Sequence, residues 1–486
     1  MQFPFGPLAP DAGETAPGVS MAADGVMPLP EGYGPAPSLA TPIGAAALPD
    51  APRGLISAFQ RDGTNVVYAF TETDVYELTT TYGWTNIATG KDLTAEDDWS
   101  TVQFGNKLLA TNTTQGLMQY DIETPAGFTD IAAAGDPREI FICANTVVAL
   151  DCLDDAGNRD NRLIRTSAIG NQNEWVKTGA DNQQLEDGGR LVGGLDLKNA
   201  AGIIFQDNAI RIIQFGATST GAFSLQKVSD GRGSVGRRSI VGLDGVAYWL
   251  STDGFKSFSG GAINHIGAGF IDEWFLSRVD QSTLTGVQAS IDPANKIVVW
   301  RYQSLQNPST TVFGDMIGYS WQFNKWFTWT EQTSYLSRIS TPGYTLDGMD
   351  GFGPLDGIDI PLDSRFWQGG QPVFAALDKE YKYATFTGAN FPATLETGVS
   401  NSPVSGLINW ATPIDNAPMG TLQVGVKNQL SDPITWKAGA SKTLPGHVPL
   451  RATGLNLAFR RNIPANAVWA YAKGVDAIVA TTWAWR

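Results

Sequence analysis

The chain has 486 residues with 42% hydrophobic composition, and 48 acidic residues against 33 basic ones give it a net charge of −15. A single hydrophobic core stops growing at roughly 250 to 300 residues, so we expect two or more cores unless the fold is a propeller or a solenoid. The acidic balance argues against a general nucleic-acid binder, which gains affinity by neutralising phosphates. The sequence has no run of about 20 apolar residues, which argues against membrane insertion.

Residues 1–50 are rich in Ala, Pro and Gly and carry almost no charge, as in PLPEGYGPAPSLATPIGAAALPDAP. Proline fixes φ and removes a backbone donor, so we expect an extended arm that becomes ordered only by lying against another surface. The sequence leaves two interpretations open, a flexible tail and an arm that crosses a neighbouring subunit. These residues also lack the basic and apolar regions of a secretory signal, so we expect assembly in a cytoplasm.

From residue 55 onward, short alternating or β-branched runs are separated by Asp, Gly and Asn turns, a pattern typical of antiparallel strands. The runs group into units of about four strands that recur every 35 to 50 residues, as a β-propeller requires. Six such units begin at Leu55, Trp99, Glu139, Leu191, Ser239 and Val287. We therefore predict an all-β fold, a propeller of about six four-stranded blades.

The domain boundaries follow from where this rhythm stops. Residues 51–400 are assigned to the propeller, and residues 401–486 to a smaller antiparallel β platform, because runs such as GTLQVGVKNQL and LNLAFRRNI form a separate set of strands. Only FIDEWFLSRV, residues 270–279, has a helical pattern, and it is short.

Two glycine motifs resemble functional sites. GRGSVG, residues 231–236, matches G-x-G-x-x-G, but a strand-like run follows it where a dinucleotide site needs a helix, so a turn is favoured. STDGFKSF, residues 251–258, is similar to the Asp box of sialidase-like propellers, although Gly254 comes one residue early and Phe258 stands where Trp belongs. Asp-Gly between strands favours a hairpin turn.

Other candidates for chemistry are weak. His265 and His447 are far apart, and no G-x-S-x-G elbow supplies a nucleophile. Cys143 and Cys152 are the only cysteines; a disulfide between them is conceivable but unneeded, and without further Cys or His ligands they predict no zinc site. An aspartate-rich segment lacks calcium-loop spacing, so turns are favoured over a metal site; its acids are Asp347, Asp350, Asp356, Asp359 and Asp363. We predict no catalytic, cofactor-binding or metal-ligating residue.

A longer set of segments resembles the tail nozzle or tail hub proteins of short-tailed bacteriophages, including those called packaged-DNA stabilisation or tail tubular proteins. The set comprises DNAIRIIQFGATSTGAFSLQKVSDGRGSVGRRSIVGLDGVAYWLSTDGFKSFSGGAINHIGAGFIDEWF, VQASIDPANKIVVWRY, GYSWQFNKWFTW, LDSRFWQGG and YKYATFTG. An aromatic strand with Trp249, the turn 251–255, the Gly260-Gly261 turn and a short helix ending at Phe275 succeed one another as in that family. The resemblance covers roughly residues 50–400, and the proline-rich arm is longer than the family's pattern.

The resemblance implies a structural virion protein, not an enzyme, that forms a hexameric ring below the portal and its adaptor in the virion tail. Such a ring continues the DNA channel, retains the packaged genome and conducts it at ejection, and an acidic lumen would let double-stranded DNA slide without specific binding. The implied partners are further copies of the chain, the portal adaptor, tail fibres or spikes, and a channel plug or needle. The alternative is a carbohydrate-binding or carbohydrate-cleaving propeller, in which exposed tryptophans would stack on sugar rings and two of the 48 acids would serve as a carboxylate pair. A third hypothesis, a bacterial surface scaffold, has no export signal to support it.

Overall fold

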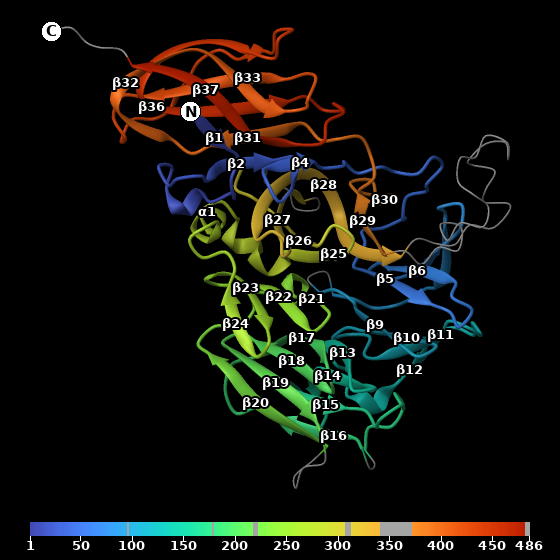
Figure 1. Cartoon of the computed structure of the whole chain (residues 1–486). Coiled ribbons are helices and arrows are strands. Elements are labelled where there is room, and N and C mark those ends of the chain that lie inside the picture. The colour runs from blue at the N-terminus through green and yellow to red at the C-terminus, as the bar shows by residue number, and fades with distance from the viewer. Residues whose placement is uncertain (95–96, 177–178, 217–221, 307–312, 341–371, 482–486) are drawn as a thin grey trace.

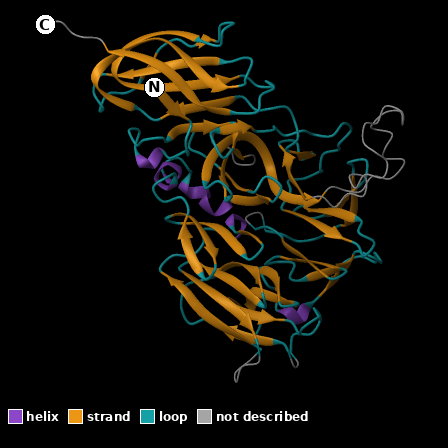
Figure 2. Cartoon of the chain, viewed as in Figure 1, coloured by secondary structure: helices purple, strands orange, loops and turns teal. Residues whose placement is uncertain are grey.

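The computed structural model describes residues 1–94, 97–176, 179–216, 222–306, 313–340 and 372–481. Two β bodies make up the molecule, a large ring of sheets and a smaller platform, and the N-terminal segment lies between them (Figure 1). Strands and loops form nearly all of both bodies, and the helices are few and short (Figure 2). Within the described ranges only α1 (Asp272–Leu276) is an α-helix, and the others are 3₁₀ helices. None of the helices described is long and apolar enough to span a membrane.

Six four-stranded antiparallel sheets follow one another along the chain, the sixth as part of a larger sheet. The first strand of each sheet contacts the first strand of the next, so these strands are innermost. In order, the sheets are β5 (Gly54–Phe59), β6 (Asn65–Phe70), β7 (Val75–Leu78), β8 (Trp84–Ala88); β9 (Ser100–Phe104), β10 (Lys107–Thr111), β11 (Met118–Asp121), β12 (Thr129–Asp130); β13 (Glu139–Cys143), β14 (Thr146–Leu153), β15 (Arg159–Thr166), β16 (Asp181–Gln184); β17 (Leu191–Lys198), β18 (Ala201–Gln206), β19 (Ala209–Phe215), β20 (Phe223–Asp230); β21 (Val241–Leu243), β22 (Val246–Ser251), β23 (Gly254–Ser259), β24 (Ala262–His265); and β25 (Gln288–Asp292), β26 (Ile297–Tyr302), β27 (Phe313–Ser320), β28 (Lys325–Ser340).

The ring closes through the second half of β28. Its first half pairs with β27, whereas its second half pairs with β29 (Pro372–Asp378), which in turn pairs with β30 (Tyr383–Thr385). This three-stranded sector lies between the sixth and first sheets: the Gln288 side chain exchanges two hydrogen bonds with the Leu336 backbone, at 2.8 and 3.0 Å, and Tyr335 packs in one apolar cluster with Leu55. The predicted β-propeller is therefore confirmed, with a three-stranded seventh sector that the sequence rhythm did not predict.

Apolar side chains between neighbouring sheets hold the propeller together, because each sheet is too small to bury both faces alone. Trp249 and Phe258 pack against the fourth sheet, and the Trp249 ring centroid lies 5.0 Å from that of Phe205. Cys143 and Cys152 are buried free thiols in two different inter-sheet clusters, one on each side of the third sheet. Burial raises the pKa of each thiol to about 12, so both behave as inert core residues.

The platform is built on long, strongly paired strands. Its central strand β36 pairs with strands on both sides, and its first half alternates buried and exposed residues, as expected for a sheet with one face on a core. The strands are β31 (Ala393–Thr397), β32 (Ser400–Asp415), β33 (Thr421–Lys427), β34 (Thr435–Trp436), β35 (Ala440–Ser441), β36 (Val448–Ile463) and β37 (Ala472–Thr481). Strand β31 pairs with β36 and so lies in the platform sheet, although it precedes the predicted boundary at residue 400.

The N-terminal arm is ordered on its own chain. Strand β1 (Gln2–Pro4) pairs with β37 of the platform, and β2 (Ser20–Asp24) pairs with β31 and, at Asp24, with Thr328 of the propeller. Strands β3 (Val26–Pro28) and β4 (Tyr33–Pro35) form a hairpin. The arm therefore connects both bodies, and its ordering requires no neighbouring subunit.

Candidate functional site

The GRGSVG motif forms a turn. It lies between β20 and the 3₁₀ turn Arg237–Ser239, so the helix N-terminus that would hold a pyrophosphate is missing at this point in the chain. A Cβ atom at Gly233 would lie 1.6 Å from the Gln206 backbone oxygen, and one at Gly236 would lie 2.5 Å from that of Thr285. These glycines are needed for close backbone approach, not for a ligand.

The STDGF motif is the hairpin between β22 and β23, as predicted. Ser251 pairs with Gly254 across the turn, and the Asp253 carboxylate lies 2.8 Å from the Lys256 Nζ. Gly254 has φ of +121°, and a Cβ atom there would lie 2.1 Å from the carboxyl carbon of Asp272. The buried Asp272 carboxylate accepts a hydrogen bond from the Phe255 backbone N–H at 2.9 Å, so the motif positions the helix that follows it.

The two histidines lie in different bodies. His265 is exposed at the end of β24, and His447 is exposed on the platform, where its Nδ1 lies 2.8 Å from the Thr412 hydroxyl oxygen. Within the described ranges no group of three or more His, Cys, Asp or Glu side chains is placed to hold a metal ion. The five predicted turn aspartates, Asp347, Asp350, Asp356, Asp359 and Asp363, lie outside the described residues.

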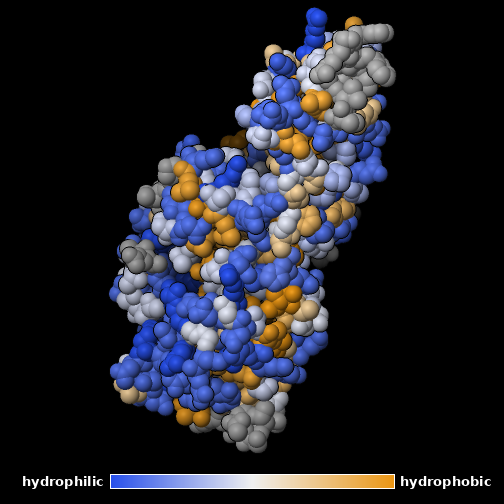
Figure 3. Space-filling view, turned by 90° about the vertical axis from the view of Figure 1, so that its left-hand side faces the viewer, coloured by the Kyte–Doolittle hydropathy of each residue, from blue (hydrophilic) through white to orange (hydrophobic). Residues whose placement is uncertain are grey.

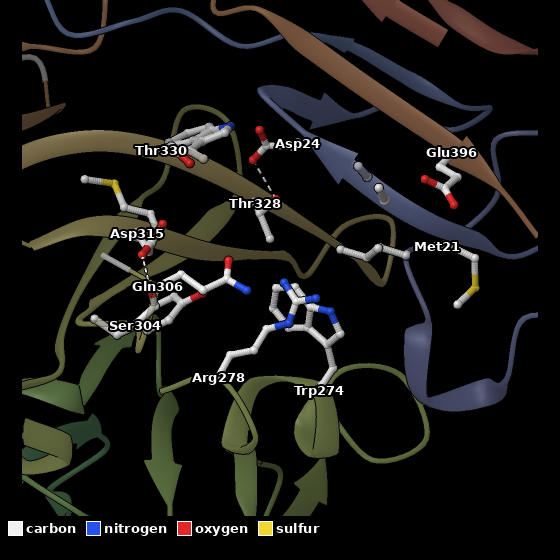
Figure 4. A pocket seen from close by; sticks show the side chains of 16 residues that line it. Met21, Asp24, Trp274, Arg278, Ser304, Gln306, Asp315, Thr328, Thr330 and Glu396 are labelled. Atoms are coloured by element: carbon white, nitrogen blue, oxygen red, sulfur yellow. Dashed lines mark hydrogen bonds between the residues drawn. The ribbon is translucent and has the colours of Figure 1, made fainter. Parts of the chain in front are cut away.

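A cavity of about 480 Å³ lies where the arm, the propeller and the platform meet, and we call it the junction cavity (Figure 4). Strand β2 of the arm contributes Asp24, the segment at α1 contributes Trp274 and Arg278, and β27 contributes Asp315. Glu396 reaches it from β31 of the platform. The cavity thus exists only because three parts of the chain are held together.

The carboxylates of the junction cavity are hydrogen-bonded and poorly solvated. The Thr328 hydroxyl donates to Asp24 at 2.7 Å, and Ser304 hydrogen-bonds to Asp315. Burial raises the pKa of Asp24; the Thr328 hydrogen bond opposes this change, and the charge of Asp315 adds to it. Burial also raises the pKa of Glu396, against two hydrogen bonds from Arg460.

Arg278 supplies the cationic wall of the same cavity. Its guanidinium carbon lies 4.2 Å from the centroid of the Trp274 ring, a cation–π contact that orients both side chains. The Asp11 carboxylate of the arm accepts the backbone N–H groups of Glu273 and Trp274 at 2.8 and 2.9 Å, which fixes the start of α1. The cavity therefore combines carboxylate acceptors, a guanidinium donor and the aromatic ring of Trp274, a set that suits a polar, hydroxyl-rich ligand.

Sequence reasoning did not find the junction cavity. Asp24 and Asp315 are separated by most of the chain, and no spacing rule connects a residue of a proline-rich arm with one on a propeller strand. The sequence did predict the short helix in FIDEWFLSR, but a helical pattern does not show which of its side chains faces a cavity.

A second charged cluster closes one end of the propeller axis. Arg237, from the segment before the fifth sheet, reaches across to Asp97 at 3.4 Å and to Glu139 at 2.9 Å, before the second and at the start of the third sheet. Arg238 forms an ion pair with Asp98 and lies over the Tyr335 ring, 4.9 Å from its centroid. These contacts connect opposite sides of the ring.

No family model matches the sequence, and no curated protein matches it. Among solved structures, the streptogramin B lyase structure is 12% identical and covers 70% of this chain and 94% of its own, with a TM-score of 0.36. BamB from Moraxella catarrhalis is 13% identical, with 62% and 82% covered and a TM-score of 0.33, and the N-terminal domain of Nup159 is 11% identical, with 51% and 72% covered and a TM-score of 0.32. Similarities this low carry no argument about function, and the propeller assignment rests on the sheet topology.

Proposed function

We propose that the chain is a structural protein of a bacteriophage tail, a subunit of the nozzle or hub ring that continues the DNA channel below the portal and adaptor. The observation that carries the proposal is the architecture. A closed propeller and a β platform are joined by an arm that belongs to the sheets of both, which suits a rigid building block of a ring. The resemblance in segments 207–275, 287–302, 318–329 and 381–388 also supports the proposal; its further segment, 362–370, lies outside the described residues.

The closed axis supports one arrangement of the proposed ring. The cross-ring ion pairs of Arg237 and Arg238 occupy one end of the propeller axis, so a single subunit offers no passage for a double helix. In the proposed ring the channel would therefore lie between subunits. A net charge of −15 suits the wall of a DNA channel, because a surface that repels phosphates lets the DNA slide past it.

The platform supplies candidate contacts between copies. Val468 is 83% exposed and Ile478 is 57% exposed, so contact with another copy would remove their apolar side chains from water. The hydropathy surface shows apolar patches between hydrophilic areas on one side of the molecule (Figure 3). Aspartate at Val468 or Ile478 is expected to weaken ring assembly. Aspartate at Ile169, a propeller residue that is 65% exposed, is the control.

Native mass spectrometry of the full chain and proteomics of purified virions test the proposal. The expected result is a ring of six copies of the 52.0 kDa chain and its presence in the tail, with an inner surface enriched in Asp and Glu. A stable monomer that is absent from particles, or a ring with a lumen lined by Lys and Arg, would overturn it.

A saccharide-binding propeller is the second candidate, favoured by the junction cavity with Asp24, Asp315, Arg278 and Trp274. Carboxylates accept hydroxyl hydrogen bonds and aromatic rings contact the apolar faces of sugars. Glycan-array binding that is lost in Arg278→Ala and kept in Lys296→Ala, an exposed position outside the cavity, would support this candidate; no binding to any glycan would remove it.

A further inference from the structure

A cavity of about 150 Å³ lies at the closed end of the propeller axis, and we call it the axial cavity. The segments that lead into the innermost strands of the second to the sixth sheets line it. Six of its lining residues are charged, four of them arginines: Asp97, Asp98, Arg138, Arg190, Arg237 and Arg238. The space is equivalent to a few water molecules at ~30 Å³ each, too small for a nucleotide.

The acids of the axial cavity are already shared between arginines. Asp97 lies 3.6 Å from Arg138 and 3.4 Å from Arg237. Asp98 is paired with Arg238 and lies 3.9 Å from Arg53. Glu139 pairs with Arg237. Three carboxylates, Asp97, Asp98 and Glu139, thus face four guanidinium groups, Arg53, Arg138, Arg237 and Arg238, so this set carries one excess positive charge; Arg190 is balanced separately by Asp207.

The excess positive charge is partly shielded from water. The side chains of Arg237 and Arg238 are only 12% and 17% exposed. Positive charge in such surroundings is costly unless an anion balances it.

Arginine N–H groups without a hydrogen bond also indicate an anion site. The buried Nε–H groups of Arg138 and Arg238 make no hydrogen bond in the part of the chain that the structure describes, and the Asp97 carboxylate lies 3.6 Å from the Arg138 Nε, beyond hydrogen-bond distance. Arg190 also lines the cavity; its side chain is 44% exposed, and its partner Asp207 lies at 3.3 Å. Guanidinium groups bind oxyanions through short, charge-assisted and often paired hydrogen bonds.

We propose that the axial cavity binds one small tetrahedral oxyanion, inorganic phosphate or sulfate, between the guanidinium groups of Arg138, Arg190 and Arg238. The anion accepts the unused Nε–H groups and balances the excess positive charge. Because these arginines belong to the segments before the third, fourth and fifth sheets, a bound anion connects three blades at the axis and stabilises the closed ring.

Calorimetric titration and thermal unfolding of the full chain with sodium phosphate test this, at an ionic strength held constant with sodium chloride. The expected result is saturable one-to-one binding of phosphate and of sulfate, with a rise in Tm that follows their concentration, and no such rise with acetate. An equal rise with chloride or acetate would show general screening and overturn the proposal.

Variants locate the site. Arg190→Gln, at the most exposed of the four arginines, and Arg138→Gln should each weaken phosphate binding at least tenfold. Arg61→Gln, at an exposed position on the turn between β5 and β6, is the matched control and should bind as the natural chain does. The Arg190 variant keeps the inner ion pairs intact, so it tests the proposal even if the Arg138 variant does not fold. Binding by both variants at the strength of the control would overturn the proposal.

Discussion

Arg461 and Asp415 form an ion pair in the platform in which neither side chain is exposed: the Arg461 Nε lies 2.9 Å from the Asp415 Oδ2. The same carboxylate accepts a hydrogen bond from the Lys442 Nζ at 2.6 Å. One carboxylate thus balances two cations where β32, β36 and the end of β35 meet. A pair of this kind contributes little net stability when intact, but the loss of one partner is expensive, because it leaves an uncompensated buried charge.

Replacing Asp415 by Asn should therefore destabilise the platform by about 3 to 5 kcal/mol, because Arg461 and Lys442 then lack a counter-charge. Denaturant unfolding followed by hydrogen exchange in β32 and β36 measures the effect on the platform separately from the propeller. Lys198→Gln, at the exposed Lys198–Asp244 pair on the propeller, is the control and should change the unfolding curve little. Equal curves for the two variants would contradict the expectation.

Tyr33 connects the arm to the propeller. Its hydroxyl oxygen accepts the Leu8 backbone N–H at 3.0 Å, and the hydroxyl donates to the Trp326 backbone oxygen at 3.2 Å, all in a fully buried setting. Tyr33→Phe leaves both backbone groups unsatisfied without creating a large cavity, so the free energy of unfolding should fall by about 1 to 3 kcal/mol. Urea unfolding of Tyr33→Phe checks this, with Tyr471→Phe on the exposed platform surface as the control. A loss no larger than in the control would show that these hydrogen bonds contribute nothing.

Local patterns and long-range pairing explain what could be predicted from the sequence. Strand alternation and Asp-Gly turns are encoded over a few residues, so the blades and the hairpin at Gly254 were found. The seventh sector was not predicted because it shares a strand with the sixth sheet. Strand β28 pairs with β27 at Trp326 and with β29 at Leu336, and the sequence shows no break between these two halves. The junction cavity combines Asp24 with Asp315, and no local pattern contains that contact.

Gly254 in the STDGF turn is required by its packing against Asp272 as well as by the turn. Gly254→Ala would place a Cβ atom 2.1 Å from the Asp272 carboxyl carbon at φ of +121°. We expect a loss of more than about 2 kcal/mol, since the clash adds to the backbone strain. Gly260→Ala, at φ of +60° with no atom within 4 Å, has only the backbone cost of about 1 kcal/mol and is the matched control. Thermal unfolding of both variants decides, and equal losses would show that Asp272 yields to the methyl group.

Asp272 should also make stability depend on pH. Burial raises its pKa from 3.8 to about 6; the Phe255 N–H and Lys256 oppose this change, and Asp11 and Asp253 add to it. The folded state therefore favours the protonated carboxyl, so the stability from this group is complete below pH 3.8 and is lost as the pH rises through 6. Asp272→Asn keeps a neutral acceptor for the Phe255 N–H. Its free energy of unfolding should thus match the natural chain near pH 4 and exceed it increasingly toward pH 7.

The control for this titration has the opposite sign. Hydrogen bonds from Ser282 lower the pKa of Asp280, so its contribution is present above pH 3.8 and is lost as the pH falls through the lowered pKa. Asp280→Asn should therefore lose stability relative to the natural chain as the pH rises, whereas Asp272→Asn gains it. Denaturant unfolding at a series of pH values from 3 to 7 measures both differences. A pH-independent difference for Asp272→Asn would mean that this carboxyl titrates alike in the folded and unfolded chain.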